Sequence, residues 1–217
     1  MAVERTEEIK KVTNGFYDNF AAKYWLRHAN PPALSIQKFI KLLPNLAGGF
    51  FPAIGSRILD LGCGGGRDAI YFRSIYSKPI CVDLSLVMCQ KAQENRLPIV
   101  QMDQEKLCFK PETFDGVWSR VSLLHSPPEV LPEILADLRL ILKPKGVLFL
   151  AMKASIGQFV ETELKVTENG TTYYCYWPTW RLHGLLETLG FEVVELSIHG
   201  KDSFNERNYF EIYAARE

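Results

Sequence analysis

Residues 57–68 read Arg-Ile-Leu-Asp-Leu-Gly-Cys-Gly-Gly-Gly-Arg-Asp. An apolar run that carries one acid, Asp60, breaks into glycines at 62, 64, 65 and 66, and a stretch with helical spacing follows. This order is typical of a buried strand, a tight turn and a helix N-terminus, where glycine lets the backbone adopt positive φ and approach a ligand closely. Asp83 comes about 20 residues after the first glycine, where a ribose-binding acid is expected. The stretch therefore predicts a nucleotide-binding turn.

The spacing of the glycines separates two classes of nucleotide. The dinucleotide fingerprint G-x-G-x-x-G needs glycine at position 67, where this chain has Arg67. Glycines at 62, 64 and 66 give G-x-G-x-G instead. Asp60 puts negative charge where a pyrophosphate would lie, and a carboxylate there suits a ligand with a cationic end, such as an amino acid. The turn therefore favours a ligand without phosphate.

Composition and charge limit the class of protein to which this chain can belong. At 217 residues, 47% of them hydrophobic, the chain has the size of a single large α/β domain. Its 25 basic and 25 acidic residues cancel, without the basic excess of typical nucleic-acid binders. We find no signal-peptide core, no apolar run of membrane length, and no metal-ligand spacing among five cysteines and four histidines. We expect a cytoplasmic protein with reduced thiols, no metal and no membrane partner.

Strand and helix patterns alternate along the chain. We expect helices over about 5–29, 33–43, 66–76, 85–95, 128–142 and 178–189, and strands over about 57–61, 79–83, 98–102, 114–119, 147–152, 191–198 and 208–215. Lys143-Pro-Lys-Gly146 is expected to turn into the strand that begins at Val147. The alternation predicts an α/β fold with a doubly wound, mostly parallel sheet, whose ligand crevice lies at the carboxyl ends of the strands.

The segment 155–177 interrupts this rhythm. Two β-prone runs, 161–166 and 171–176, flank Glu168-Asn169-Gly170, which is a strong hairpin signal. We therefore expect one domain over residues 1–217. Its parts are an N-terminal helical cap (1–44), a nucleotide-binding core (55–152), the hairpin insertion (155–177) and a closing helix with two strands (178–217).

The glycine turn and the acids Asp60, Asp83 and Asp103, in this order, resemble the motifs of class I S-adenosylmethionine-dependent methyltransferases. The resemblance covers about residues 55–152, and the closing helix and strands are compatible with it. It implies a Rossmann-like, seven-stranded sheet that is mostly parallel, with an antiparallel last strand and helices on both faces. It also implies in-line methyl transfer from S-adenosylmethionine to an acceptor, for which we expect a small molecule.

The resemblance assigns the first group of cofactor-binding positions to the glycine turn and the second strand. Gly62, Cys63 and Gly64 would line the amino-acid part of S-adenosylmethionine. Asp83, in Val-Asp-Leu-Ser with Leu84 beside it, would take the ribose hydroxyls. The alternative for Asp83 is a structural one, a cap for the helix over 85–95.

A second group of positions follows the third and fourth strands. Asp103 would face the adenine amino group, with Gln104 beside it. Ser119 and Arg120 would present backbone next to the methionine portion. The stretch from Tyr17 to Tyr24, Tyr-Asp-x-x-Ala-x-x-Tyr, resembles an N-terminal element that covers the cofactor, although tyrosines at helical spacing also fit the core.

For three side chains near this region, the sequence leaves two alternative roles open. His125, just beyond the fourth strand, is the candidate catalytic base, and a solvated loop histidine is the alternative. Arg67 and Arg120 would pair either with ligand carboxylates or with local acids. Methyl transfer needs a base only where the acceptor must lose a proton.

Other functions remain open at this point. A nicotinamide-dependent oxidoreductase or a non-catalytic nucleotide-binding protein would also use a glycine turn. Within methyltransferases, tRNA or protein acceptors are alternatives to a small molecule. The Asp/Asn-Pro-Pro-Tyr/Phe motif of amino-methylating DNA enzymes is replaced by Ser119-Arg-Val-Ser122, which argues against that substrate.

Overall fold

A computed structural model describes residues 2–27, 30–44, 54–200 and 207–217. The helices are α1 (Ala2–Arg27), α2 (Ala33–Leu42), α3 (Arg67–Ser74), α4 (Leu86–Glu94), the 3₁₀ turn η1 (Leu123–His125), α5 (Leu131–Ile141) and α6 (Thr179–Thr188). The strands are β1 (Arg57–Leu61), β2 (Lys78–Asp83), β3 (Ile99–Gln101), β4 (Phe114–Arg120), β5 (Leu142–Lys153), β6 (Glu161–Thr167), β7 (Gly170–Tyr176), β8 (Phe191–His199) and β9 (Tyr209–Arg216). Within these ranges, no helix has both the length and the apolar character needed to cross a membrane.

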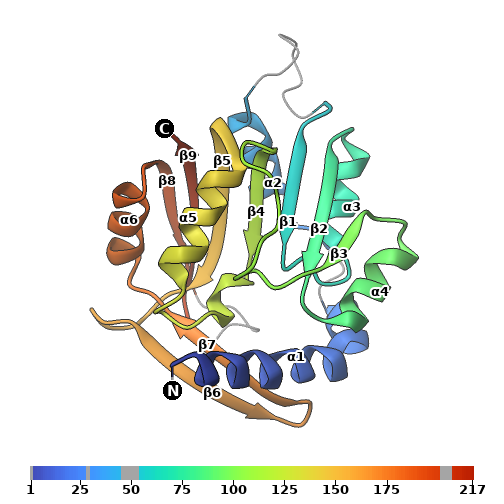
Figure 1. The fold of residues 1–217 in the computed structure, drawn as a ribbon, viewed down its shortest axis with the longest axis vertical. Coiled ribbons are helices and arrows are strands. Elements are labelled where there is room, and N and C mark those ends of the chain that lie inside the picture. The colour runs from blue at the N-terminus through green and yellow to red at the C-terminus, as the bar shows by residue number, and fades with distance from the viewer. Residues whose placement is uncertain (1, 28–29, 45–53, 201–206) are drawn as a thin grey trace.

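Seven strands form one twisted sheet in the order β3-β2-β1-β4-β5-β9-β8 (Figure 1). β1 to β5 pair in parallel, and β9 runs antiparallel to both β5 and β8. This topology confirms the doubly wound sheet with an antiparallel last strand. The strand order reverses between β1 and β4, which is the point where ligands bind in open α/β sheets.

The two faces of the sheet are covered by different helices because side chains alternate along each strand. In β1, Ile58 packs with the aromatic cluster built on α2 and α3, which includes Phe39 and Phe72. Leu59 and Leu61 point the other way, into the larger core shared with α5 and α6. All of these side chains are fully buried. The predicted coverage by helices on both faces is confirmed (Figure 1).

The start of β5 differs from the sequence expectation. β5 begins at Leu142, so the segment expected to be a turn is an irregular part of the strand. Leu142 pairs with Phe114 and Val147 with Gly116, which leaves more residues on β5 than on β4 between the two pairs. The Lys143 ammonium holds this bulge to Asp115 across a 2.7 Å Nζ–Oδ1 distance. Because a bulge contains turn-like backbone, its sequence resembled a turn.

The predicted hairpin is confirmed as β6 and β7, which lie with α1 across one end of the sheet (Figure 1). The strands pair from Glu161 with Tyr176 to Thr167 with Gly170. The Tyr173 amide donates a 3.2 Å hydrogen bond to Thr13 Oγ1 of α1. The hairpin therefore contacts α1, and both elements lie across the ends of the parallel strands.

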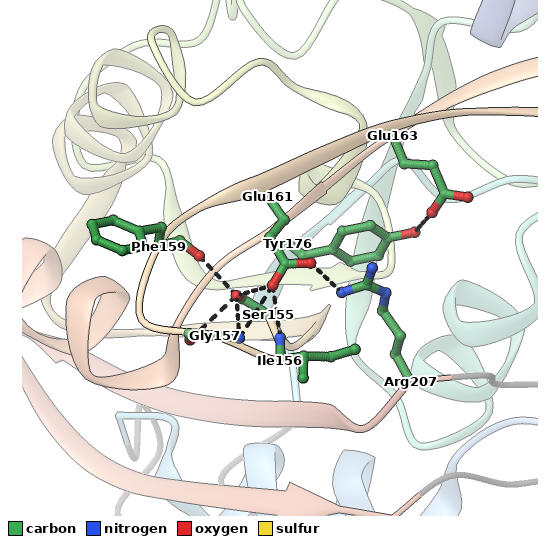
Figure 2. A network of polar contacts seen from close by, with 8 residues as sticks. All are labelled: Ser155, Ile156, Gly157, Phe159, Glu161, Glu163, Tyr176 and Arg207. Carbon is green, nitrogen blue, oxygen red and sulfur yellow. Dashed lines mark hydrogen bonds and ion pairs between the residues drawn. The ribbon is translucent and has the colours of Figure 1, made fainter.

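A polar network fixes the loop between β5 and β6 (Figure 2). Ser155 Oγ donates to Glu161 Oε1 at 2.6 Å, and Arg207 Nη1 donates to Glu161 Oε2 at 2.7 Å. These two hydrogen bonds lower the pKa of Glu161 to about 2. The Arg207 guanidinium also lies 4.0 Å from the ring centre of Tyr176, whose hydroxyl donates to Glu163. The network links the root of the hairpin to the segment before β9.

Candidate active site

A cavity opens where the carboxyl ends of β1, β2 and β4 meet the inner face of α1. The loops after β3 and β4 complete its wall. Because five parallel strands end at this edge of the sheet, side chains that are distant in sequence converge here. This is the crevice that the strand pattern predicted.

The glycine turn forms the floor of the cavity after β1. Gly62, Gly64 and Gly66 have positive φ of 67°, 56° and 84°, as the sequence indicated. A Cβ on Gly62 would lie 2.3 Å from the Cβ of Ser122, a distance that no packed pair of carbons can adopt. The amides of Gly62 and Cys63 both donate to the Val82 carbonyl, at 2.8 and 3.0 Å. The turn is thus held against β2 and the loop after β4.

Asp83 stands at the end of β2 and lines the cavity. Its Oδ2 accepts a 2.8 Å hydrogen bond from the Gly64 amide, and its Oδ1 accepts one of 2.9 Å from the Ser85 amide. Burial raises the pKa of Asp83 to about 6, and these amides only partly offset it. Ser85 is the N-cap of α4, since its hydroxyl accepts from Met88 N. The Ser85 hydroxyl also donates to Asp18 of α1 at 2.5 Å.

The loop after β3 is tied to α1 by an ion-pair cluster. Lys10 Nζ lies 2.7 Å from Asp103 Oδ2 and 2.7 Å from Glu105 Oε2. Burial would lower the pKa of Lys10, but hydrogen bonds to both acids raise it overall. Gln104 Nε2 donates to Ser126 Oγ at 2.8 Å. All five of these cavity-lining side chains therefore have partners within the protein.

Asp60 is buried beneath the glycine turn and does not line the cavity. Burial, with the nearby charge of Asp68, raises its pKa well above the usual range. Its Oδ2 has no hydrogen-bond partner among the described residues. Arg67 donates to Asp68 Oδ1 at 2.6 Å, and the Trp118 indole donates to Oδ2 of the same acid at 2.9 Å. Arg67 thus pairs with a local acid, one of its two predicted readings.

The end of β4 contributes Ser119 and Arg120. The Ser119 hydroxyl is buried, 2.9 Å from the hydroxyl of Ser122, which donates to the Leu61 carbonyl. Arg120 lines the cavity, and its Nε is buried without a partner among the described residues. Val121 follows with φ of 61°, a left-handed conformation that is costly for a β-branched residue.

His125 is partly buried at the cavity wall and is not a solvated loop histidine. Its Nδ1 lies 2.6 Å from the Tyr173 carbonyl oxygen, which can only accept, so Nδ1 carries the proton. Its Nε2 lies 2.7 Å from the Tyr17 hydroxyl and therefore accepts. Loss of hydration lowers the pKa of His125 to about 4. The imidazole is a neutral group with both nitrogens engaged.

Replacing Tyr17 by phenylalanine is expected to lower the free energy of unfolding by about 1–3 kcal/mol, because His125 Nε2 loses its donor in a desolvated place. Urea denaturation measures this change. Tyr76→Phe is the control, because Tyr76 is 76% exposed and its loss of a hydroxyl should change stability by less than about 0.5 kcal/mol. Equal effects of the two substitutions would contradict the buried tyrosine–histidine bond.

The cavity brings together most of the sequence-predicted residues: Gly62, Gly64, Asp83, Leu84, Asp103, Gln104, Arg120 and His125 line it. Three others lie behind the wall, namely Asp60, Cys63 and Ser119. The Cys63 side chain packs against the small apolar cluster that contains Ala69 and Cys81. The backbone of Tyr24 belongs to α1, but its side chain lies outside the described residues.

Sequence reasoning missed the polar face that α1 turns toward the cavity. Lys10, Thr13, Asn14 and Tyr17 all line it, and of these only Tyr17 was considered. Their spacing of three, one and three residues is the signature of one helix face. The signal was present in the sequence, but a polar helix face is normally solvated.

A family model described as "Methyltransferase domain" matches residues 58–146, from β1 to the bulge of β5. Residues 58–146 therefore resemble a methyltransferase domain. The chain is 34% identical over 110 positions to a glycine/sarcosine/dimethylglycine N-methyltransferase of Actinopolyspora halophila, covering 46% of this chain and 19% of that protein. It is 33% identical over 92 positions to a malonyl-[acyl-carrier protein] O-methyltransferase of Salmonella typhimurium, covering 42% and 36%. The chain thus matches between a fifth and about a third of these relatives.

Solved structures share the fold of this chain. A structure described as a SAM-dependent methyltransferase from Methanosarcina mazei superimposes with a TM-score of 0.70 at 16% identity, covering 86% of this chain and 98% of that one. A Burkholderia thailandensis 1,6-didemethyltoxoflavin-N1-methyltransferase, solved with S-adenosylhomocysteine, gives 0.62 at 23% identity, covering 75% and 72%. At these identities the agreement concerns the fold.

Proposed function

We propose that this chain transfers a methyl group from S-adenosylmethionine to a small-molecule acceptor. The observation that carries the proposal is Asp83. Its carboxylate lines the cavity directly beside Gly62 and Gly64, which have positive φ and a backbone open to a ligand. An acid at the end of β2 next to such a turn suits ribose hydroxyls, and Arg67, the basic residue that follows the glycines, is paired with Asp68 instead of being placed to hold a pyrophosphate.

The residues present fit the cofactor in three places. Asp83 would accept hydrogen bonds from the ribose hydroxyls, and the backbone of Gly62 and Gly64 would line the amino-acid portion. Asp103 and Gln104 would lie at the adenine, with Lys10 holding the loop and α1 together above it. S-adenosylmethionine would supply an activated methyl group on a sulfonium. The acceptor atom would attack the methyl carbon in line with the carbon–sulfur bond, and the sulfur would leave as a neutral thioether.

The protein's own contribution is positioning and exclusion of water. α1 and the hairpin lie across the carboxyl ends of the strands (Figure 1), and side chains of α1 line the cavity, where they would exclude water from bound reactants. Holding nucleophile, methyl carbon and sulfur in line removes an entropic barrier of about 7–11 kcal/mol in well-oriented systems. The neutral His125 with its Tyr17 partner shapes the wall near Ser122, rather than offering a free imidazole nitrogen.

The acceptor is proposed to be a small molecule because α1 forms one wall of the cavity over the strand ends and the chain has no net charge. A tRNA acceptor would call for a basic surface. A protein acceptor would need an open groove at the cavity mouth. The relatives include an N-methyltransferase and an O-methyltransferase, so both nitrogen and oxygen acceptors occur among them.

Calorimetric titration with S-adenosylhomocysteine, S-adenosylmethionine and NAD(P)H tests the proposal. We expect dissociation constants in the micromolar range for the first two ligands and no binding of the nicotinamide nucleotides. Tight binding of NADH, or no binding of S-adenosylhomocysteine by folded protein, would overturn it. Tight binding without turnover on any acceptor would instead identify a non-catalytic binding protein.

A further inference from the structure

Charge is unevenly distributed around the cavity, and part of it has no role in the proposed binding of the cofactor. Three carboxylates, Asp83, Asp103 and Glu105, lie toward β2 and β3, and each is already hydrogen-bonded. Lys10, which also lines the cavity, is shared between two of these acids. At the end of β4, Arg120 carries a positive charge for which the described residues supply no acidic partner.

Arg120 is also held in place by its surroundings. Its Nε is excluded from solvent, so an N–H donor is left unsatisfied, which is costly for a charged group. The next residue, Val121, adopts φ of 61°, while its amide donates to Ala151 O at 2.9 Å. Strained backbone of this kind persists where the surrounding structure fixes it, and it clusters at ligand sites. An anion at the cavity would satisfy the guanidinium.

Among the residues that the structure describes, this wall has no free base that could activate a protonated nucleophile. Both nitrogens of His125 are hydrogen-bonded, one as donor to the Tyr173 carbonyl and one as acceptor from Tyr17. Asp103 and Glu105 are paired with Lys10. An acceptor that suits this wall is therefore nucleophilic in the form that it has at neutral pH. A carboxylate meets both conditions, because it is an anion and its oxygen needs no deprotonation.

We propose, on the basis of the methyltransferase function above, that the acceptor is a carboxylic acid whose carboxylate is anchored by Arg120 and methylated on oxygen. One carboxylate oxygen accepts from the guanidinium, and the other forms the bond to the methyl carbon as the carbon–sulfur bond breaks. The bonding electrons stay on sulfur, and no proton is transferred. A carboxylate and a sulfonium become a neutral ester and a neutral thioether.

Arg120 in this role lowers KM more than it raises kcat. Its ion pair with the acceptor exists in the ground state and is lost as the oxygen becomes part of an ester. Interactions of that kind improve binding without lowering the barrier from the bound state. The loss of the anion on methylation also weakens the hold on the product and favours its release.

The test uses the full chain and methyl-labelled S-adenosylmethionine with a panel of carboxylic acids, each matched with the primary amide and the alcohol of the same skeleton. We expect label to enter acids alone and to be released as volatile methanol in alkali, as for a methyl ester. Arg120→Met should raise KM for the acid roughly tenfold to a hundredfold with kcat within about twofold. Arg120→Lys should give an intermediate KM, because it keeps the charge without the planar fork. Arg181→Met, which removes an exposed cation outside the cavity, is the matched control.

Binding of S-adenosylhomocysteine, measured by calorimetry on every variant, separates the possible failures. Unchanged affinity in Arg120→Met supports the acceptor role, and a loss as large as the rise in KM would overturn it by assigning Arg120 to the cofactor's own carboxylate. Alkali-stable label, or a panel in which no acid is methylated, would also overturn it while leaving the methyltransferase function intact. Absence of binding to the unaltered protein would refute that function itself.

Discussion

Alanine at position 62 is expected to remove cofactor binding and a large part of the stability of the fold. Its Cβ would lie 2.3 Å from the Cβ of Ser122, and the backbone φ of 67° is unfavourable for any residue with a side chain. The left-handed conformation costs about 1–2 kcal/mol. Forcing a methyl group into a filled space costs about 1–3 kcal/mol more. Urea denaturation should therefore show a loss of about 2–5 kcal/mol, and calorimetry should show at least about tenfold weaker binding of S-adenosylhomocysteine.

The matched control is Gly184→Ala in α6, where no atom lies within 4 Å of the added Cβ. Alanine in a helix interior is more favourable than glycine by about 0.5–1 kcal/mol, so this variant should be neutral or more stable. A double-mutant cycle with Ser122→Gly isolates the clash, because removing the opposing Cβ should restore part of the stability. Equal stability of Gly62→Ala and Gly184→Ala would contradict the close approach of β1 and the loop after β4.

Most of the fold could be predicted because its signals are local. The alternation of Ile58, Leu59 and Leu61 is enough to mark β1 as a strand buried on both faces, and the glycines that follow mark its end. The start of β5 could not be read in this way. The pairing of Leu142 with Phe114 depends on a partner strand, and the Lys-Pro-Lys-Gly sequence after it is indistinguishable from a turn.

In the candidate site, too, residues that are close in the chain could be predicted and long-range contacts could not. Asp83 and the glycine turn are close in the chain and follow one another in a strand–turn–helix unit, so spacing located them. Lys10 and Asp103 are 93 residues apart, and Tyr17 and His125 are 108 apart. No local pattern signals such contacts, since they arise when α1 packs across the strand ends. The neutral, doubly bonded state of His125 is a property of that packing.

Replacing Asp83 by asparagine is expected to weaken binding of S-adenosylhomocysteine about ten- to a hundredfold, because a charge-assisted hydrogen bond to a ribose hydroxyl contributes about 1.5–3 kcal/mol. Asparagine keeps the size of the side chain and one acceptor for the amide of Gly64 or Ser85. The affinity should therefore fall more than the stability. Calorimetry on the variant measures this, with Asp137→Asn on the exposed face of α5 as the control.

The pH dependence of binding distinguishes the charge of Asp83 from its shape. Burial raises the pKa of this carboxyl to about 6, so it is ionised above pH 6 and becomes protonated below. Only the ionised form accepts from both ribose hydroxyls, so affinity should fall with falling pH, and at pH 5 it should be about tenfold weaker than at pH 7.5. His125 adds little in this window, because its pKa is about 4. The Asp83→Asn variant should show a flat profile between pH 5 and 7.5. A slope that persists in the variant would assign the titration to another acid at the cavity, such as Glu105, whose pKa is also raised by burial.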